Sequence, residues 1–122
     1  MEYLGDTTMS APALNAVDLS RDEARALFDR VMRNAELMLK HNCVHADLSA
    51  FNILYWDGDI RIIDLPQAVN PYVNPKAFQM FERDIARVCQ YFARIGIYTD
   101  PRQRAREMWR RNVKRDTSEV FL

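Results

Sequence analysis

Three side chains that can take part in phosphoryl transfer, Asp47, Asn52 and Asp64, fall within residues 45–64. Transfer from a nucleotide requires a group that accepts the proton of the attacking hydroxyl and a divalent metal that holds the phosphates. Asp47, in a loop before a strand, is placed to accept the proton. Asn52 and Asp64 would supply one carbonyl and one carboxylate to Mg²⁺, which prefers few protein ligands beside phosphate oxygens. Taken singly, each residue is also typical of loop or strand capping, so the prediction rests on their order and spacing.

A β-hairpin is expected to bring these residues together. Two runs of strand-forming residues, Asn52–Trp56 and Ile60–Ile63, flank Asp57-Gly58-Asp59, a turn sequence whose residues tolerate positive φ. The two predicted metal ligands then lie at the open end of the hairpin, and the loop with the proton acceptor leads into it.

A helix over residues 20–41 is predicted from its start and its period. Ser20 and Glu23 form a capping box, in which the serine side chain accepts from the Glu23 amide and the glutamate reaches back. Apolar residues then recur at helical spacing and predict one buried face. They are Ala24, Leu27, Val31, Ala35 and Met38.

Two further helices are predicted after the hairpin. The first spans residues 75–95, because Pro75 suits a first helical turn and Gly96 suits a helix end. The second spans residues 100–115 and begins with an Asp100 cap.

The composition limits the class of protein. One short hairpin among helices cannot form a large sheet, so the sequence predicts an α+β fold, mainly helical, as a single domain over residues 1–122. Residues 1–19 hold no strong period and are expected to be an extended start and a loop. The formal net charge is zero, which excludes a global attraction to nucleic acid or membrane, and no membrane span or signal pattern is present. Cys43 and Cys89 lack metal-ligand spacing, which favours reduced core residues and a cytoplasmic location.

The central stretch resembles the catalytic core of the RIO family of atypical serine kinases. It reads His45-x-Asp47-Leu-Ser49-x-x-Asn52-Ile-Leu-Tyr-Trp and then Ile62-Ile63-Asp64-Leu-Pro-Gln67. Protein kinases at large place a lysine between the catalytic aspartate and the asparagine, whereas this chain has Ser49 in that region, as the RIO pattern does. After Asp64 the chain passes almost directly into a helix, without a Phe-Gly sequence or a long activation segment.

This resemblance implies a protein-kinase-like C-terminal lobe that uses ATP and Mg²⁺. Asp47 and Asp64 would be catalytic, and Asn52 and Asp64 would bind the metal. The acceptor would be a serine-containing protein or the chain itself. In some RIO enzymes the metal-binding aspartate is phosphorylated during an ATPase-like cycle, which makes Asp64 a candidate for an aspartyl-phosphate.

The resemblance extends to both sides of the motif. Residues 1–5 are similar to the hinge strand of RIO kinases, so Glu2 and Leu4 are expected to contact the adenine ring. Downstream, the Phe81-Glu-Arg-Asp84 stretch is also similar to the family, and its Arg83 and Asp84 are expected to be structural polar anchors. His45 is likewise expected to bond nearby backbone and hold the loop.

Two parts of a kinase are missing from the sequence. A glycine-rich loop and a strand lysine normally clamp the phosphates, but the three glycines form no G-x-G and the three lysines lie in predicted helices. We therefore expect an N-terminal lobe to be absent and the isolated chain to show weak or no ATP binding and negligible turnover.

Two rival classes of function remain open. A small-molecule phosphotransferase of the aminoglycoside or choline kinase type shares the His-x-Asp…Asn…Asp core, but usually has His or Asp where Ser49 stands. A non-catalytic kinase-like binding module is the second.

Basic residues in the last helix form either a solvated face or a contact for pre-ribosomal RNA, and the neutral overall charge favours the solvated face. The basic residues of this helix are Arg102, Arg104, Arg106, Arg110, Arg111, Lys114 and Arg115.

Overall fold

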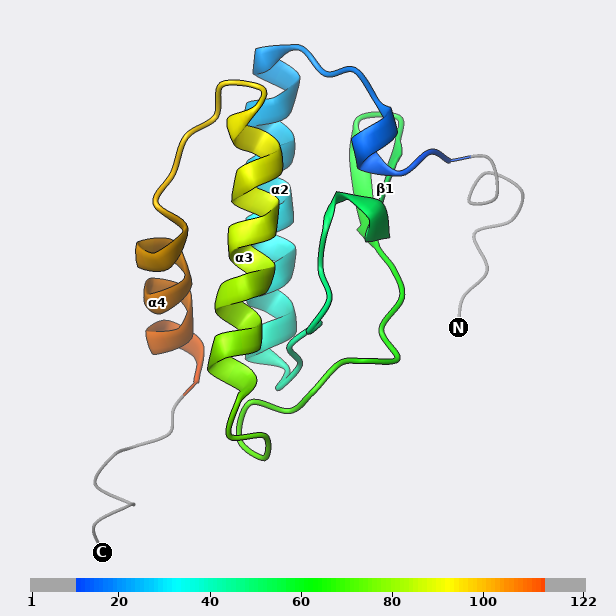
Figure 1. The fold of residues 1–122 in the computed structure, drawn as a ribbon. Coiled ribbons are helices and arrows are strands. Elements are labelled where there is room, and N and C mark those ends of the chain that lie inside the picture. Colours follow the sequence, from blue (N-terminus) through cyan, green and yellow to red (C-terminus); the bar gives the residue numbers. More distant parts are fainter. Residues whose placement is uncertain (1–10, 114–122) are drawn as a thin grey trace, which may run out of the picture.

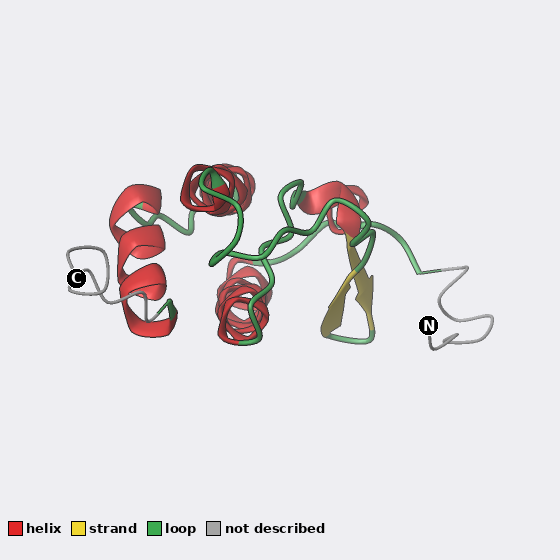
Figure 2. Ribbon diagram, turned by 90° about the horizontal axis from the view of Figure 1, so that it is seen from below, coloured by secondary structure: helices red, strands yellow, loops and turns green. Residues whose placement is uncertain are grey.

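The computed structural model describes residues 11–113, so the expected adenine contacts Glu2 and Leu4 lie outside the described residues. Its main elements are three helices: α2 (Arg21–Lys40), α3 (Ala77–Ala93) and α4 (Pro101–Asn112). Helices α2 and α3 run side by side in opposite directions, with α4 on one side of the pair and a β-hairpin on the other (Figures 1 and 2). The predicted α+β, mainly helical fold is confirmed. In the described part of the chain, no helix has the length and apolar character needed to cross a membrane.

Helix α2 forms as its sequence predicts. The Ser20 hydroxyl accepts from the Glu23 amide at 3.1 Å, and the Glu23 carboxylate accepts from the Ser20 amide at 3.0 Å, which confirms the capping box. The apolar face is buried against α3, where Phe28 meets Phe92 edge to face with ring centroids 5.4 Å apart. Both rings are buried in the hydrophobic core.

Helices α3 and α4 differ from their expected bounds only at the ends. Helix α3 begins at Ala77 rather than near Pro75, because the Asn74 carbonyl accepts from the Ala77 amide and its side chain from the Lys76 amide, which closes a turn there. In α4 the Asp100 carboxylate accepts from the amides of Arg102 and Gln103, as a cap should. Helix α4 ends at Asn112 rather than near residue 115, because the backbone of Val113 is extended (φ −96°, ψ 104°).

Helix α4 is fastened to α2 at Glu36. The Glu36 carboxylate accepts from Arg111 Nε at 2.8 Å and Nη2 at 3.0 Å, and from Asn112 Nδ2 at 2.6 Å. Arg104 lies over the Phe28 ring at 5.6 Å, and Arg102 lies 3.9 Å from Glu82. Arg102, Arg104 and Arg111 thus contact the chain itself, while the solvated face and the RNA contact both stay predictions.

The hairpin consists of β1 (Ile53–Trp56) and β2 (Asp59–Ile62), paired antiparallel with Ile53 opposite Ile62. Its turn has two residues at positive φ, Asp57 at 52° and Gly58 at 79°, the geometry that matches strand twist. Asp59 therefore belongs to the strand rather than to the turn. Its carboxylate lies 2.6 Å from Arg30, which holds the hairpin on α2.

The segment before α2 has more regular structure than the predicted loop. Pro12 accepts from the Tyr55 amide at 2.9 Å and Ala13 forms a β-bridge with Leu54, so this segment satisfies the outer edge of β1. A 3₁₀ helix, η1 (Leu14–Ala16), follows and buries Leu14 completely. Tyr91 of α3 donates to the Leu14 carbonyl at 2.9 Å, which joins this segment to the helical layer.

Candidate active site

The loop that carries Asp47 is tied to the segment that follows Asp64. Val44 and Val69 exchange both of their backbone hydrogen bonds, each 2.8 Å long. After this bridge the loop runs through a 3₁₀ turn, η2 (Ala50–Asn52), directly into β1. The two stretches that hold the predicted site residues are therefore joined at both ends of the loop.

His45 connects the two halves of the predicted site. Its side chain is buried, its Nδ1 accepts from the Asp47 amide at 3.2 Å, and its Nε2 lies 2.8 Å from the Ile63 carbonyl oxygen. Because an amide only donates and a carbonyl only accepts, this pattern requires the tautomer with the proton on Nε2. Both ring nitrogens are thus engaged with backbone, and the predicted anchoring role of His45 is confirmed.

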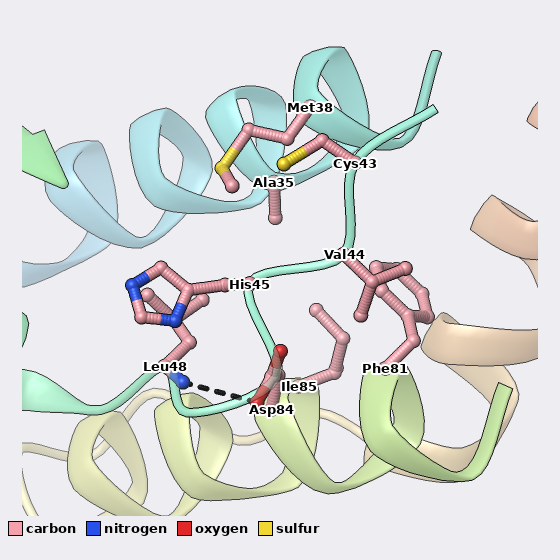
Figure 3. A pocket seen from close by; sticks show the side chains of 9 residues that line it. All are labelled: Ala35, Met38, Cys43, Val44, His45, Leu48, Phe81, Asp84 and Ile85. Carbon is pink, nitrogen blue, oxygen red and sulfur yellow. Dashed lines mark hydrogen bonds between the residues drawn. The ribbon is translucent and has the colours of Figure 1, made fainter. Parts of the chain in front are cut away.

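Asp84 holds the same loop from helix α3. Asp84 is 2 % exposed, and its carboxylate accepts from the amides of Ala46 at 2.8 Å and Leu48 at 3.0 Å, on either side of Asp47. Figure 3 shows the bond to Leu48. Burial raises the pKa of Asp84 above its ordinary value, and the two amide bonds oppose this rise. The polar-anchor prediction for Asp84 is confirmed. A cavity of about 10 Å³ lies beside it, between α2, the loop and α3, with His45 and Asp84 in its wall.

The loop backbone is strained at Ala46, beside the predicted proton acceptor. Ala46 has a φ of 75°, a left-handed conformation that costs a residue with a Cβ about 1–2 kcal/mol. Arg83 donates from Nη2 to the Ala46 carbonyl at 2.7 Å, and Asp84 accepts from its amide. Two neighbouring residues of α3 therefore bind the carbonyl and the amide of this alanine. These bonds fix the backbone beside Asp47 and so the direction in which its side chain projects.

The Asp47 carboxylate is half-exposed and forms an ion pair with Arg87 of α3. Arg87 Nη1 lies 3.0 Å from Asp47 Oδ1, and the two side chains are 41 % and 44 % exposed. Arg87 was not predicted from the sequence. A signal was present, because Arg87 lies one helical turn after the anchor Asp84 and therefore on the same side of α3.

The Asn52 carboxamide is turned toward Ser49. Asn52 is buried, and its Oδ1 accepts from the Ser49 amide at 2.8 Å and from the Ser49 hydroxyl at 3.0 Å. The carbonyl oxygen has two lone pairs, so a metal can use it only if the Ser49 hydroxyl turns away. The predicted metal-binding role of Asn52 is thus compatible with its position but requires this change.

Asp64 lies across the hairpin end from Asn52. The Ile63 amide donates to the Asn52 carbonyl at 2.9 Å, which extends the strand pairing by one step and places Asp64 directly after the pair. Asp64 is exposed and has a φ of 72°, an uncommon conformation for a residue other than glycine. Within residues 11–113, no hydrogen bond or ion pair engages its carboxylate.

These groups fit a magnesium site that is completed by phosphates. Within the described range, no group of three or more His, Cys, Asp or Glu side chains could hold a metal ion by itself. Mg²⁺ is commonly bound through one or two carboxylates, with water and substrate phosphates as the other ligands. The open carboxylate of Asp64, with the Asn52 oxygen nearby, matches that donor set.

Comparisons with known proteins show the family to which this chain belongs. A family model described as the RIO domain matches residues 1–105. The chain is 39% identical over 98 residues to the serine/threonine-protein kinase RIO1 of Homo sapiens, covering 80% of this chain and 17% of that protein. It is 40% identical over 101 residues to the RIO-type serine/threonine-protein kinase Rio1 of Thermoplasma acidophilum, covering 83% of this chain and 51% of that protein. The chain thus spans about half, or less, of the length of these relatives.

A solved structure supports the same fold. The Rio2 kinase–ADP/Mg²⁺–phosphoaspartate complex from Chaetomium thermophilum matches with a TM-score of 0.62 and 21% sequence identity, over 91% of this chain and 40% of that one. At this identity the likeness concerns the fold alone. Together with the family match over most of the sequence, it identifies this chain as a member of the RIO family, with the helices and hairpin of a RIO kinase domain.

Proposed function

We propose that this chain supplies the hydroxyl-positioning and metal-binding groups of a RIO-type serine/threonine protein kinase. Asp47 accepts the proton of an attacking serine hydroxyl, and Asp64, with Asn52, holds Mg²⁺ on the phosphates of ATP. Mg²⁺ would neutralise charge on the transferred phosphates. The acceptor is a serine-containing protein or the chain itself, because the relatives named above are serine/threonine-protein kinases.

The observation that carries this proposal is the placement of Asp47 and Asp64 by a single buried ring. His45 bonds the Asp47 amide and the carbonyl of Ile63, the residue before Asp64. In-line transfer requires the base and the metal to keep a fixed separation, since catalysis here is mostly positioning and electrostatic stabilisation. A non-catalytic module would have no need of this link between the Asp47 loop and the residue before Asp64.

A second route of transfer also passes through Asp64. The structural neighbour is a phosphoaspartate complex, and the Asp64 carboxylate is exposed with no partner in the described part of the chain. In this route a carboxylate oxygen attacks the γ-phosphorus, ADP leaves, and water later hydrolyses the aspartyl-phosphate. Trapping a phosphorylated residue 64 by borohydride reduction after incubation with ATP distinguishes this ATPase route from direct transfer to serine.

Manganese binding tests the metal assignment in the 122-residue chain itself. Mn²⁺ replaces Mg²⁺ at oxygen sites and broadens nearby amide signals in an NMR spectrum, so we expect broadening centred on Asp64 and Asn52. Asp64→Asn should abolish it, whereas Asp29→Asn, at an exposed position on α2, should leave it unchanged. Broadening centred elsewhere, or unaffected by Asp64→Asn, contradicts the proposal.

Acceptor assays separate the remaining classes. With ATP and the part of the Thermoplasma acidophilum relative that this chain does not cover, we expect transfer to a serine-containing protein and none to an aminoglycoside or choline. A location in the cytoplasm, which the two cysteines favour, and an association with pre-ribosomal RNA, which the family suggests, remain proposals. Binding to RNA with steep salt dependence, lost on neutralising Arg110 and Arg111, would support the RNA association.

A further inference from the structure

We propose that Arg87 contacts the transferred phosphoryl group at this site. The inference rests on the proposed function, because it assumes that the acceptor hydroxyl binds at Asp47. It adds a residue from helix α3 to a site that the sequence places entirely in the loop and hairpin. Arg87 would be a catalytic residue, since its guanidinium would touch the reacting atoms.

The loop itself supplies no positive charge. Residues 48–51, between Asp47 and Asn52, are Leu-Ser-Ala-Phe, and the Ser49 hydroxyl is bonded to Asn52. Phosphoryl transfer spreads negative charge over the oxygens of the transferred group, and cations at that position stabilise it. A cation at the transferred phosphoryl group must therefore come from an element outside this loop.

Arg87 is the cation that the described structure places at Asp47. Its Nη1 lies 3.0 Å from Asp47 Oδ1. Helix α3 cannot move freely relative to the loop, because Asp84 bonds the loop amides on both sides of Asp47. Arg83 lies next to Asp84 on α3, but it donates to the Ala46 carbonyl and not to Asp47.

The remaining donors of Arg87 are open to a ligand. A guanidinium carries five N–H groups in a planar fork that suits phosphate oxygens. One of them donates to Asp47, and no other bond from this side chain is found within residues 11–113. The side chain is 41 % exposed, so phosphoryl oxygens can reach these donors.

The transfer step is consistent with this arrangement. The serine oxygen forms a bond to the γ-phosphorus while the bond from that phosphorus to the bridging oxygen of ADP breaks. The hydroxyl proton goes to the Asp47 carboxylate, which becomes neutral. Arg87 then loses the negative charge of its partner as a phosphoserine forms beside it, so its attraction shifts from Asp47 to the product.

A phosphoserine peptide and the same peptide with unmodified serine provide the test with the 122-residue chain. We expect the phosphoserine peptide alone to shift the Arg87 Nε–Hε signal and the Asp47 amide signal in NMR titrations. Arg87→Gln should weaken phosphoserine binding at least about tenfold, and Arg87→Lys less, because a lysine keeps the charge without the fork. Arg106→Gln, at an exposed arginine of α4 on the far side of the helix pair, should bind as the unsubstituted chain does.

The outcomes separate this inference from the proposed function. Equal phosphoserine affinity in the unsubstituted chain and Arg87→Gln, or no phosphate-dependent shift at millimolar peptide, overturns the role of Arg87. Either result leaves the manganese test at Asp64 unaffected. Failure of the manganese test together with phosphate-dependent shifts at Arg87 would instead overturn the metal assignment and leave an anion-binding arginine.

Discussion

The Nε2 atom of His45 lies 2.8 Å from the carbonyl oxygen of Ile63, and the same ring accepts from the Asp47 amide. One imidazole therefore spans the loop and the hairpin end that carry the two proposed functional aspartates. The ring is 3 % exposed, so water cannot replace these bonds readily. The geometry of the site thus depends on a side chain that takes no chemical part in transfer.

Replacing His45 by phenylalanine keeps a ring of similar size in place but removes both hydrogen bonds. The Asp47 amide and the Ile63 carbonyl then lose a buried partner, and we expect the free energy of unfolding to fall by about 2–3 kcal/mol. Urea denaturation of the unsubstituted chain and of His45→Phe measures this. The matched control is His41→Phe, at the exposed end of α2, which should change it by less than about 0.5 kcal/mol. Equal effects at both positions would refute the link.

Substitutions of the two proposed functional aspartates should have different effects on transfer and on manganese binding. Asp47→Ala removes the proton acceptor and should lower the transfer rate about 10²–10⁴-fold, while manganese binding at Asp64 is retained. Asp64→Ala should lose both phosphoryl transfer and manganese binding. The assay mixes the 122-residue chain with ATP and the uncovered part of the Thermoplasma acidophilum relative, and NMR broadening reports the metal. Loss of manganese binding in Asp47→Ala would mean that the two residues form one metal site.

Local signals predicted most of the helices and the hairpin. The Ser20 capping box and the Asp100 cap are short-range patterns, and both form as expected. The start of α3 was less predictable, since Asn74 competes with Pro75 by closing a turn of its own. The segment at Ala13 escaped prediction because its partner, Leu54, is distant in sequence and the pairing has no local signal.

The candidate site likewise has features with a local sequence signal and features that depend on contacts between distant segments. The motif predicted Asp47, Asn52 and Asp64, because their identity and spacing carry the chemistry. The orientation of Asn52 toward Ser49 and the ion pair between Asp47 and Arg87 depend on tertiary packing. No single-sequence pattern ranks such contacts, although the anchors on α3 showed which helix would meet the loop.

Asp84 should make stability fall as pH rises through the acid range. Its pKa is raised above the ordinary value of 3.8, mainly by burial, so the folded chain binds this proton more tightly than the unfolded chain does. Its contribution to stability is therefore greatest below pH 3.8, declines from there up to the raised folded pKa, and is constant above it. Asp84→Asn removes this titration. The stability of the unsubstituted chain minus that of Asp84→Asn, from urea denaturation at each pH, should fall as pH rises.

The opposite slope would show that the two amide hydrogen bonds stabilise the ionised carboxylate more than burial destabilises it. A difference that does not change with pH would mean that Asp84 titrates equally in both states. Either outcome would contradict the raised pKa without affecting the observed contacts of Asp84 with the loop.

The contribution of Glu36 to stability should depend on pH in the opposite direction, so it provides an internal comparison for Asp84. Hydrogen bonds from Arg111, opposed by burial and helped by Asn112, hold the pKa of Glu36 below its ordinary value of 4.5. The ionised form is thus stabilised in the folded chain, and this contribution is present above pH 4.5 and is lost as pH falls through the lowered folded pKa. Glu36→Gln should cost about 1 kcal/mol at neutral pH, because charge-assisted bonds that fasten α4 become neutral.

The stability difference between the unsubstituted chain and Glu36→Gln should therefore grow as pH rises, in contrast to that for Asp84→Asn. High salt should reduce it, since Arg111 is more than half exposed and surface charges are screened. The same urea denaturations at several pH values measure both differences. If Glu36→Gln and Asp84→Asn followed one slope, the global charge of the chain rather than these two local environments would control its acid stability.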